Sequence, residues 1–178
     1  MVLTINAQPL PKLPMPDYAA LSISTLHFSH VPTLNSYRYI GTLAKEKTEI
    51  SLYITYGESG DKRELEYGTQ YRRHTSGYGI NSFSYGMDVS LLKYEAQGEF
   101  VSSSASVFQI GPRVAYTWYL NNFFLRPQIG IDAWLGIFGS VTEREYSSYL
   151  GRKTNALPII ALMPDFQLEV GWSFKIVT

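Results

Sequence analysis

The segment 26–30, Leu-His-Phe-Ser-His, contains the only pair of residues in the chain whose types and spacing favour nucleophilic catalysis. His27 and Ser29 are two positions apart, so they would share one face of a β-strand. A histidine placed there can accept the proton of the serine hydroxyl and activate it for attack on an ester. The alternative interpretation is that 27–30 is the polar end of a strand that enters a loop.

The remaining chemistry of the sequence is mostly ionic. Cysteine is absent, and His27 with His30 is too sparse for a metal site. No phosphate-binding loop, zinc motif or nucleotide fingerprint appears, so the sequence predicts neither a metal nor a cofactor. The formal net charge is +0 at pH 7, which gives no indication of nucleic-acid binding.

Nine charged residues stand at the polar positions of amphipathic segments, and we predict that they form a network inside the protein. Charges removed from water must be paired. Arg113 and Arg126 are expected to lie near each other on paired strands. Their candidate carboxylate partners are Asp88, Asp132 and Glu169. The complete predicted network is Glu64, Glu66, Arg72, Asp88, Arg113, Arg126, Asp132, Glu169 and Lys175.

The elements that must position these residues are strands, because apolar and polar residues alternate along the chain. From Phe166 to Ile176 every second residue is apolar, including Trp172, and the residues between them are polar or small. The same period of two recurs in 49–56, 64–72, 82–91, 108–120 and 125–137. A strand with one apolar and one polar face suits a barrel with lipid outside and a polar lumen inside. We therefore predict an all-β fold, an eight-stranded antiparallel transmembrane β-barrel.

Eight strands account for the pattern, with short turns at 44–47, 74–78 and 121–122 on the periplasmic side. The outer loops are then 31–35, 57–62, 95–103 and 139–154. A rival interpretation makes Pro164-Asp165 a hairpin turn and merges the early strands; otherwise this pair interrupts the last strand. The predicted strands are 18–30, 36–43, 48–57, 63–73, 79–94, 104–120, 123–138 and 155–177.

At 178 residues the chain is most simply one domain. Residues 8–17 are rich in proline, which cannot pair within a sheet, and we interpret 1–17 as a periplasmic lead-in. Residues 1–7 would be the remnant of a cleaved signal or an added start, and 18–178 the single barrel domain. Aromatic residues make up 15% of the chain, as girdles at two membrane interfaces require. The girdle candidates are Tyr18, Tyr37, Tyr39, Tyr53, Tyr56, Tyr67, Tyr71, Trp118, Tyr119 and Phe123.

The segment Gly111–Gly136 resembles a central hairpin of small outer-membrane barrels of the OmpA, OmpX and OmpW kind. In those proteins an aromatic strand turns briefly into an ascending F-x-R-P-x-x-G strand, which here reads Phe-Leu-Arg-Pro-Gln-Ile-Gly over 124–130. The resemblance implies a bacterial outer-membrane location. The end of the chain also looks like the C-terminal assembly signal of such proteins, although it continues through Val177-Thr178. That signal would comprise Glu169, Gly171, Phe174 and Ile176, and it implies assembly by the outer-membrane insertion machinery.

Three functions follow as hypotheses. The first is a non-enzymatic outer-membrane protein with a charge-plugged lumen, which gives structural support or binds an extracellular ligand through loops 95–103 and 139–154. Its other partners would be outer-membrane lipids and lipopolysaccharide. The second is a conduit for small apolar molecules with a lateral opening near 156–165. The third is a lipid A-modifying hydrolase, because His27 and Ser29 resemble the pair in lipid A deacylases, with His30 where that family has Asn. Outside membranes, a soluble lipocalin-like barrel with the apolar face inside is the alternative.

Overall fold

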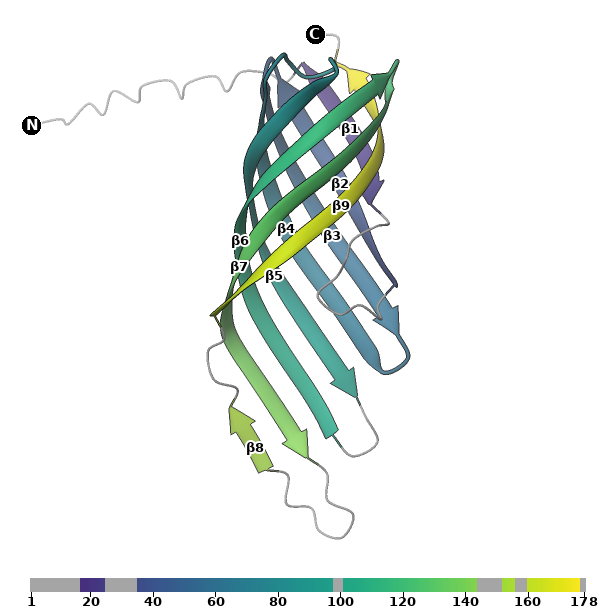
Figure 1. Cartoon of the computed structure of the whole chain (residues 1–178). Coiled ribbons are helices and arrows are strands. Elements are labelled where there is room, and N and C mark those ends of the chain that lie inside the picture. Colours follow the sequence, from purple (N-terminus) through teal and green to yellow (C-terminus); the bar gives the residue numbers. More distant parts are fainter. Residues whose placement is uncertain (1–16, 25–34, 98–100, 144–151, 156–159, 177–178) are drawn as a thin grey trace, which may run out of the picture.

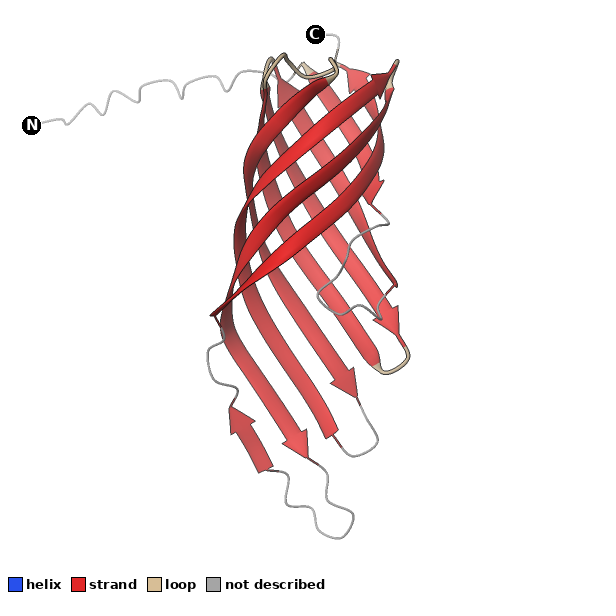
Figure 2. Cartoon of the chain, viewed as in Figure 1, coloured by secondary structure: helices blue, strands red, loops and turns tan. Residues whose placement is uncertain are grey.

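The computed structural model describes residues 17–24, 35–97, 101–143, 152–155 and 160–176. All regular structure in these ranges is strand, as Figure 2 shows. No helix among them is long and apolar enough to cross a membrane. The strands are β1 (Tyr18–Ser24), β2 (Asn35–Lys45), β3 (Thr48–Ser59), β4 (Lys62–His74), β5 (Ser82–Gln97), β6 (Val101–Leu120), β7 (Phe123–Glu143), β8 (Arg152–Asn155) and β9 (Ile160–Lys175).

Eight of these strands close into a barrel in which every described pairing is antiparallel. Neighbours follow the order β6-β5-β4-β3-β2-β1-β9-β7, and β7 returns to β6. The first strand meets the last, with Tyr18 opposite Lys175. We call the end where these two residues lie the terminal end and the opposite end the far end (Figure 1). The prediction of an all-β, eight-stranded antiparallel barrel is confirmed.

The long strands β5, β6 and β7 continue beyond the rest of the barrel at the far end (Figure 1). Loop 95–103 is therefore shorter than predicted, since β5 reaches Gln97 and β6 begins at Val101. Loop 139–154 is shorter as well, because β7 extends to Glu143 and pairs there with the additional strand β8. The extended segments 101–106 and 139–143 are rich in serine, threonine and small residues. They lack the apolar alternation on which the strand prediction depends.

The last predicted strand, 155–177, is wrong as a single element. Its residues divide between β8 and β9, and 156–159 lie outside the described residues. Pro164 and Asp165 neither form a turn nor interrupt the strand, because they pair with Ile131 and Gly130 of β7 inside β9. The rival hairpin interpretation is therefore also wrong. The turn after β4 is longer than predicted and runs to Asn81, since β5 begins at Ser82.

The side chains divide as the alternation predicts, with large apolar groups outside and polar groups inside. Leu52, Phe83 and Trp172 are among the exposed apolar residues, whereas most of the buried residues are polar or charged. This arrangement contradicts the soluble lipocalin-like alternative, which requires an apolar interior. Three girdle candidates do not belong to a girdle. Tyr53 is buried in the lumen, and Tyr18 and Tyr119 pack against a buried cluster at the terminal end that consists of Ala20, Ala44, Tyr78 and Phe124.

Candidate functional site

Glycines leave the space that the charged side chains occupy. Arg113 of β6 lies in register between Gly86 of β5 and Gly130 of β7. A Cβ atom added at Gly130 would overlap the Arg113 guanidinium. One step along the strands the order reverses, and a Cβ added at Gly111 would lie 2.5 Å from Oδ1 of Asp132. Small and large residues thus alternate around the wall, which lets a narrow barrel hold long charged side chains.

Five buried residues near the terminal end form the first ionic group, which we call the terminal cluster. Its centre is Glu49 of β3, which accepts hydrogen bonds from Arg126 Nη1 and Nη2, each at 2.9 Å. Arg72 Nη1 donates to the same carboxylate at 2.5 Å, and His74 Nε2 lies 2.9 Å from its Oε2. Glu169 of β9 completes the cluster, 3.1 Å from Arg126 Nη1. All five side chains are at most 1% exposed.

The Arg126–Glu49 contact crosses the lumen from one wall to the opposite wall. Going round the barrel in either direction, β7 and β3 are four strands apart, which is the largest separation in an eight-stranded ring. Arg126 also donates from Nε to the Thr117 hydroxyl at 2.9 Å and lies over the Phe124 ring. Because this pair bridges the lumen along its diameter, side chains rather than open space fill this layer.

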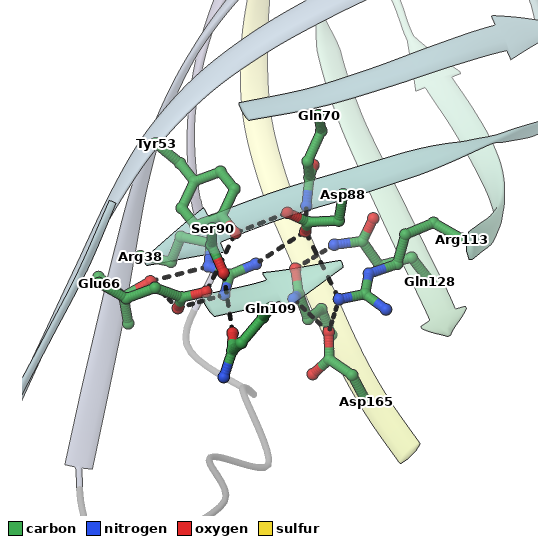
Figure 3. A network of polar contacts seen from close by, with 12 residues as sticks. Arg38, Tyr53, Glu66, Gln70, Asp88, Ser90, Gln109, Arg113, Gln128 and Asp165 are labelled. Atoms are coloured by element: carbon green, nitrogen blue, oxygen red, sulfur yellow. Dashed lines mark hydrogen bonds and ion pairs between the residues drawn. The ribbon is translucent and has the colours of Figure 1, made fainter. Parts of the chain in front are cut away.

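The second ionic group lies further from the terminal end, and Figure 3 labels its members Arg38, Glu66, Asp88, Arg113 and Asp165. We call it the central cluster: Arg38, Glu66, Asp88, Arg113, Asp132 and Asp165. Arg38 of β2 donates to Glu66 at 2.7 Å, and its guanidinium stacks 4.0 Å from the centre of the Tyr53 ring. The Tyr53 hydroxyl lies 3.0 Å from Glu66 Oε1 and 2.7 Å from Asp88 Oδ1. One phenol therefore shares its proton between two carboxylates.

Arg113 gathers three carboxylates from three different strands. Its Nη2 lies 2.7 Å from Asp132, 3.1 Å from Asp165 and 3.5 Å from Asp88. These partners come from β7, β9 and β5. With its own strand β6, the guanidinium thereby connects four adjacent strands, which are half of the barrel wall and include Pro164 of β9.

Glutamines connect the two clusters. Gln70 donates to Asp88 at 2.6 Å and accepts from Arg72. Arg72 also donates to Gln128 at 2.6 Å. Gln128 in turn donates to Gln167, which donates to Asp165 at 2.6 Å. The described lumen therefore contains one continuous polar network, and such a network is stable when its members satisfy one another.

Tyr78 closes the terminal end. It sits in the turn between β4 and β5 and is flanked by Gly77 and Gly79, both with positive φ, which turn the chain inward. Its ring is 4% exposed and packs 5.4 Å from Tyr18 and 5.6 Å from Tyr119, measured between ring centres. Burial raises the pKa of the Tyr78 phenol, so this hydroxyl stays neutral. An uncharged aromatic side chain thus fills the opening of the barrel at the terminal end, next to the terminal cluster.

The structure brings most of the predicted charged residues into the lumen and leaves one outside it. Eight are buried: Glu64, Glu66, Arg72, Asp88, Arg113, Arg126, Asp132 and Glu169. Lys175 is exposed, because it is the last residue of β9 and lies at the rim; the ion pairs found among the described residues do not include it. Arg113 and Arg126 also lie in different clusters, since Arg113 is opposite Gly130 whereas Arg126 is beside Thr117.

Sequence reasoning missed four members of the network: Arg38, Glu49, His74 and Asp165. Glu49 and Arg38 each alternate in step with the inward-facing residues of their strand, so the period of two could have identified both of them. The sequence predicts that a turn begins at His74, whereas in the structure this residue ends β4. Asp165 follows Pro164, and the proline predicts a turn or an interruption of the strand instead of an inward-facing position.

The other sequence candidates have varied positions. His27, Ser29 and His30 lie outside the described residues. In the predicted assembly signal, Gly171 faces inward and makes room for the Phe124 ring, and Phe174 is exposed on the outer face. Ile176 follows β9 and donates its backbone N–H to the carbonyl of Asp17 at 2.9 Å. Within the described ranges no group of three or more histidines or carboxylates is arranged to hold a metal ion.

Replacing Gly68 by alanine tests the packing of the central cluster. The Tyr53 ring lies directly over Gly68, and an added Cβ would overlap it. We expect Tyr53 to be displaced from Glu66 and Asp88, at a cost of about 1–3 kcal/mol in the free energy of unfolding. Urea titration in detergent micelles measures this loss. The matched control is Gly41→Ala, since nothing lies within 4 Å of a Cβ at that position. Equal urea midpoints for the two variants would contradict the prediction.

The comparisons with known proteins bear on the fold. No family model matches the chain, and no curated protein matches it. Among solved structures, a major outer membrane protein from Thermus thermophilus is similar, with a TM-score of 0.51 and 11% identity. The match covers 88% of this chain and 98% of that chain. At this identity the likeness is one of fold. The chain is therefore an eight-stranded β-barrel with the fold of an outer-membrane protein.

Proposed function

We propose that this chain is an integral outer-membrane barrel that catalyses no reaction and acts as a structural component of the membrane or through its far end. The outer face supports a lipid environment, because large apolar side chains remain exposed on every barrel strand whose outer side chains are described, from Leu21 of β1 to Trp172 of β9. A water-soluble protein rarely exposes so continuous an apolar surface. In this orientation the terminal end faces the periplasm, as the shortness of its turns supports.

The observation that carries a non-transporting role is the filled lumen. The terminal cluster, the central cluster and Tyr78 occupy successive layers, and one contact of the terminal cluster spans the full diameter. An eight-stranded barrel has an interior just wide enough for its own side chains. Little radius then remains for a solute, which also weighs against a conduit through the barrel axis.

The far end is the part available to an extracellular partner. There β5, β6 and β7 project beyond the other barrel strands and carry β8 at their edge (Figure 1). We propose that this projection, with the connections 98–100 and 144–151, presents the adhesive or ligand-binding surface. Lipopolysaccharide and other outer-membrane lipids would surround the barrel, and the outer-membrane insertion machinery would assemble it.

Electrical recording in planar bilayers tests the closed lumen. Wild-type protein reconstituted from detergent should show no large, steady conductance, and a known porin in the same bilayers serves as the positive control. Tyr78→Ala should remain silent too, because both ionic clusters are intact in this variant. Porin-sized conductance in wild type would contradict the proposal. Conductance in Tyr78→Ala alone would assign the seal to the aromatic mouth instead of the ionic clusters.

Two simpler observations test the rest of the proposal. The purified chain should stay folded only in detergent, and unboiled protein should migrate differently from boiled protein on a denaturing gel. A folded, monodisperse sample without detergent would overturn membrane residence. Deacylation of lipid A that disappears in His27→Ala would instead establish the enzymatic hypothesis.

A further inference from the structure

A groove crosses the outer surface of β1, β2 and β3 and is centred on Gly41. Gly41 pairs with Leu21 on one side and with Leu52 on the other. Both leucines are 68% exposed, and a Cβ built at Gly41 would meet nothing within 4 Å. The missing side chain therefore leaves a slot between two apolar walls.

The slot has a volume of about 480 Å³, and Tyr39 and Ile54 also line it. Its outward-facing side chains are apolar apart from the tyrosine hydroxyl. Elsewhere in the same row around the barrel, side chains such as Val89 and Ile110 fill the position that Gly41 leaves open. The slot is narrow and apolar, so a slender acyl chain fits its shape better than a bulky apolar side chain of another protein.

The depth of the slot places it in one leaflet. Gly41 is four residues from Lys45, the last residue of β2 at the terminal end. At about 3.3 Å per residue and a strand tilt of about 40°, Gly41 is roughly 10 Å above that end. The apolar band of such barrels is about 25 Å tall, so the slot lies in the half that adjoins the terminal end.

Cationic side chains lie at the terminal end of the wall that contains the slot. Lys45 and Arg73 occupy outward positions at the terminal ends of β2 and β4, and Lys47 lies in the turn between β2 and β3. Two carboxylates, Asp17 and Glu46, are near these cations. The Asp17 carboxylate accepts a hydrogen bond from the backbone N–H of Glu46 at 3.2 Å. The described turns 75–81 and 121–122, which connect β4 with β5 and β6 with β7, contain no charged residue. The first of them packs beside Lys47, whose Nζ donates to the Thr75 carbonyl at 3.1 Å. Together with Lys175 at the end of β9, the exposed and partly exposed cations of the terminal rim therefore lie on the arc from β9 through β1 to β4, and the described rim of β5, β6 and β7 carries none.

We infer that this face binds one anionic glycerophospholipid of the periplasmic leaflet, with an acyl chain in the Gly41 slot and the phosphate beside Lys45 and Arg73. The inference rests on the proposed outer-membrane location. It adds a defined lipid site to a surface that would otherwise contact lipid without preference. The apolar slot and the charged rim are independent features that fit the two parts of the same molecule.

Native mass spectrometry of the detergent-solubilised barrel tests the site. Protein is mixed with equal amounts of phosphatidylglycerol and phosphatidylethanolamine, and the lipid that remains bound to it is identified. Wild type should retain one phosphatidylglycerol in preference to phosphatidylethanolamine. Gly41→Leu fills the slot and should weaken retention about fivefold or more. Its matched control is Ala133→Leu, which enlarges an outward side chain on β7, far from the slot, and should leave retention unchanged.

The charged rim is tested separately, with a variant that leaves the slot intact. Lys45→Gln combined with Arg73→Gln should reduce the preference for phosphatidylglycerol about thirtyfold, while Lys93→Gln near the far end should not. These rim positions are solvent-exposed or partly exposed, so the pair tests the inference even if Gly41→Leu fails to fold.

Three results would overturn the inference. The first is equal retention by Gly41→Leu and Ala133→Leu in folded protein. The second is the absence of any preference between the two lipids in wild type. The third is a doubled mass in wild type that becomes single in Gly41→Leu, which would assign the slot to a second copy of this chain. A barrel that stays folded without detergent would instead refute the proposed function, so the two failures are distinguishable.

Discussion

Replacing Arg126 by methionine is expected to lower the free energy of unfolding by about 3–5 kcal/mol. Arg126 is fully buried and donates to both oxygens of Glu49 as well as to Glu169. Methionine fills much of the same volume but carries no charge, so two buried carboxylates lose a hydrogen-bond donor. The cost arises mainly from those uncompensated charges rather than from the intrinsic strength of the ion pair.

Urea titration in detergent micelles, followed by the mobility difference between folded and unfolded bands, measures the effect of Arg126→Met. Lys175→Met removes a positive charge at the exposed rim and should leave the midpoint unchanged. Adding Glu49→Gln to Arg126→Met should recover part of the loss, since the variant then buries one charge fewer. A loss below about 1 kcal/mol would show that water reaches the terminal cluster.

Introducing arginine at Ile131 is expected to cost about 2–4 kcal/mol. Ile131 lies on the outer face of β7, 53% exposed, in register with Pro164 of β9. If lipid surrounds this face, the guanidinium must be held in the hydrocarbon of the bilayer. The free energy of unfolding into urea from micelles or vesicles gives the magnitude.

The control for this substitution is an arginine introduced at a different depth in the membrane. Leu120→Arg introduces the same side chain at the last residue of β6, where the outer face reaches the terminal end. There the arginine can extend into the interface, so the cost should fall to about 0–1 kcal/mol. If both variants cost the same, the apolar outer face is not spanning a bilayer.

The sequence was sufficient to predict the fold and the direction of most side chains. Alternation alone places Trp172 outside and Glu169 inside, because the period of a strand is two and the residue types on the two faces differ. Alternation failed to predict the side-chain direction where the residue types on the two faces of a strand do not differ. In β2, serine and threonine blur the contrast between the faces, and Arg38 was overlooked although it is completely buried. Composition also suggested a membrane-interface position for Tyr53, whose parity along β3 places it inside.

The partners of the charged residues could not be predicted from the sequence. Pairing across a lumen depends on how far each strand is displaced relative to its neighbours, and that displacement accumulates around the barrel. Arg126 finds Glu49 on the opposite wall, 77 residues away. No local pattern encodes that contact. The glycines gave a partial signal, since Gly86, Gly111 and Gly130 fall at inward positions, yet their role beside Arg113 and Asp132 requires the register.

The reach of the terminal cluster has a consequence for how the barrel forms. The Ser22 hydroxyl donates to Glu169 at 2.5 Å across 147 residues of sequence, and β1 and β9 are the first and last strands. The charges in this layer therefore keep their water until the sheet closes, and they exchange it for one another in a late step. Such long-range closure is slow. Reversal requires several buried ion pairs to separate together, so the closed barrel should open rarely and persist long after conditions cease to favour it.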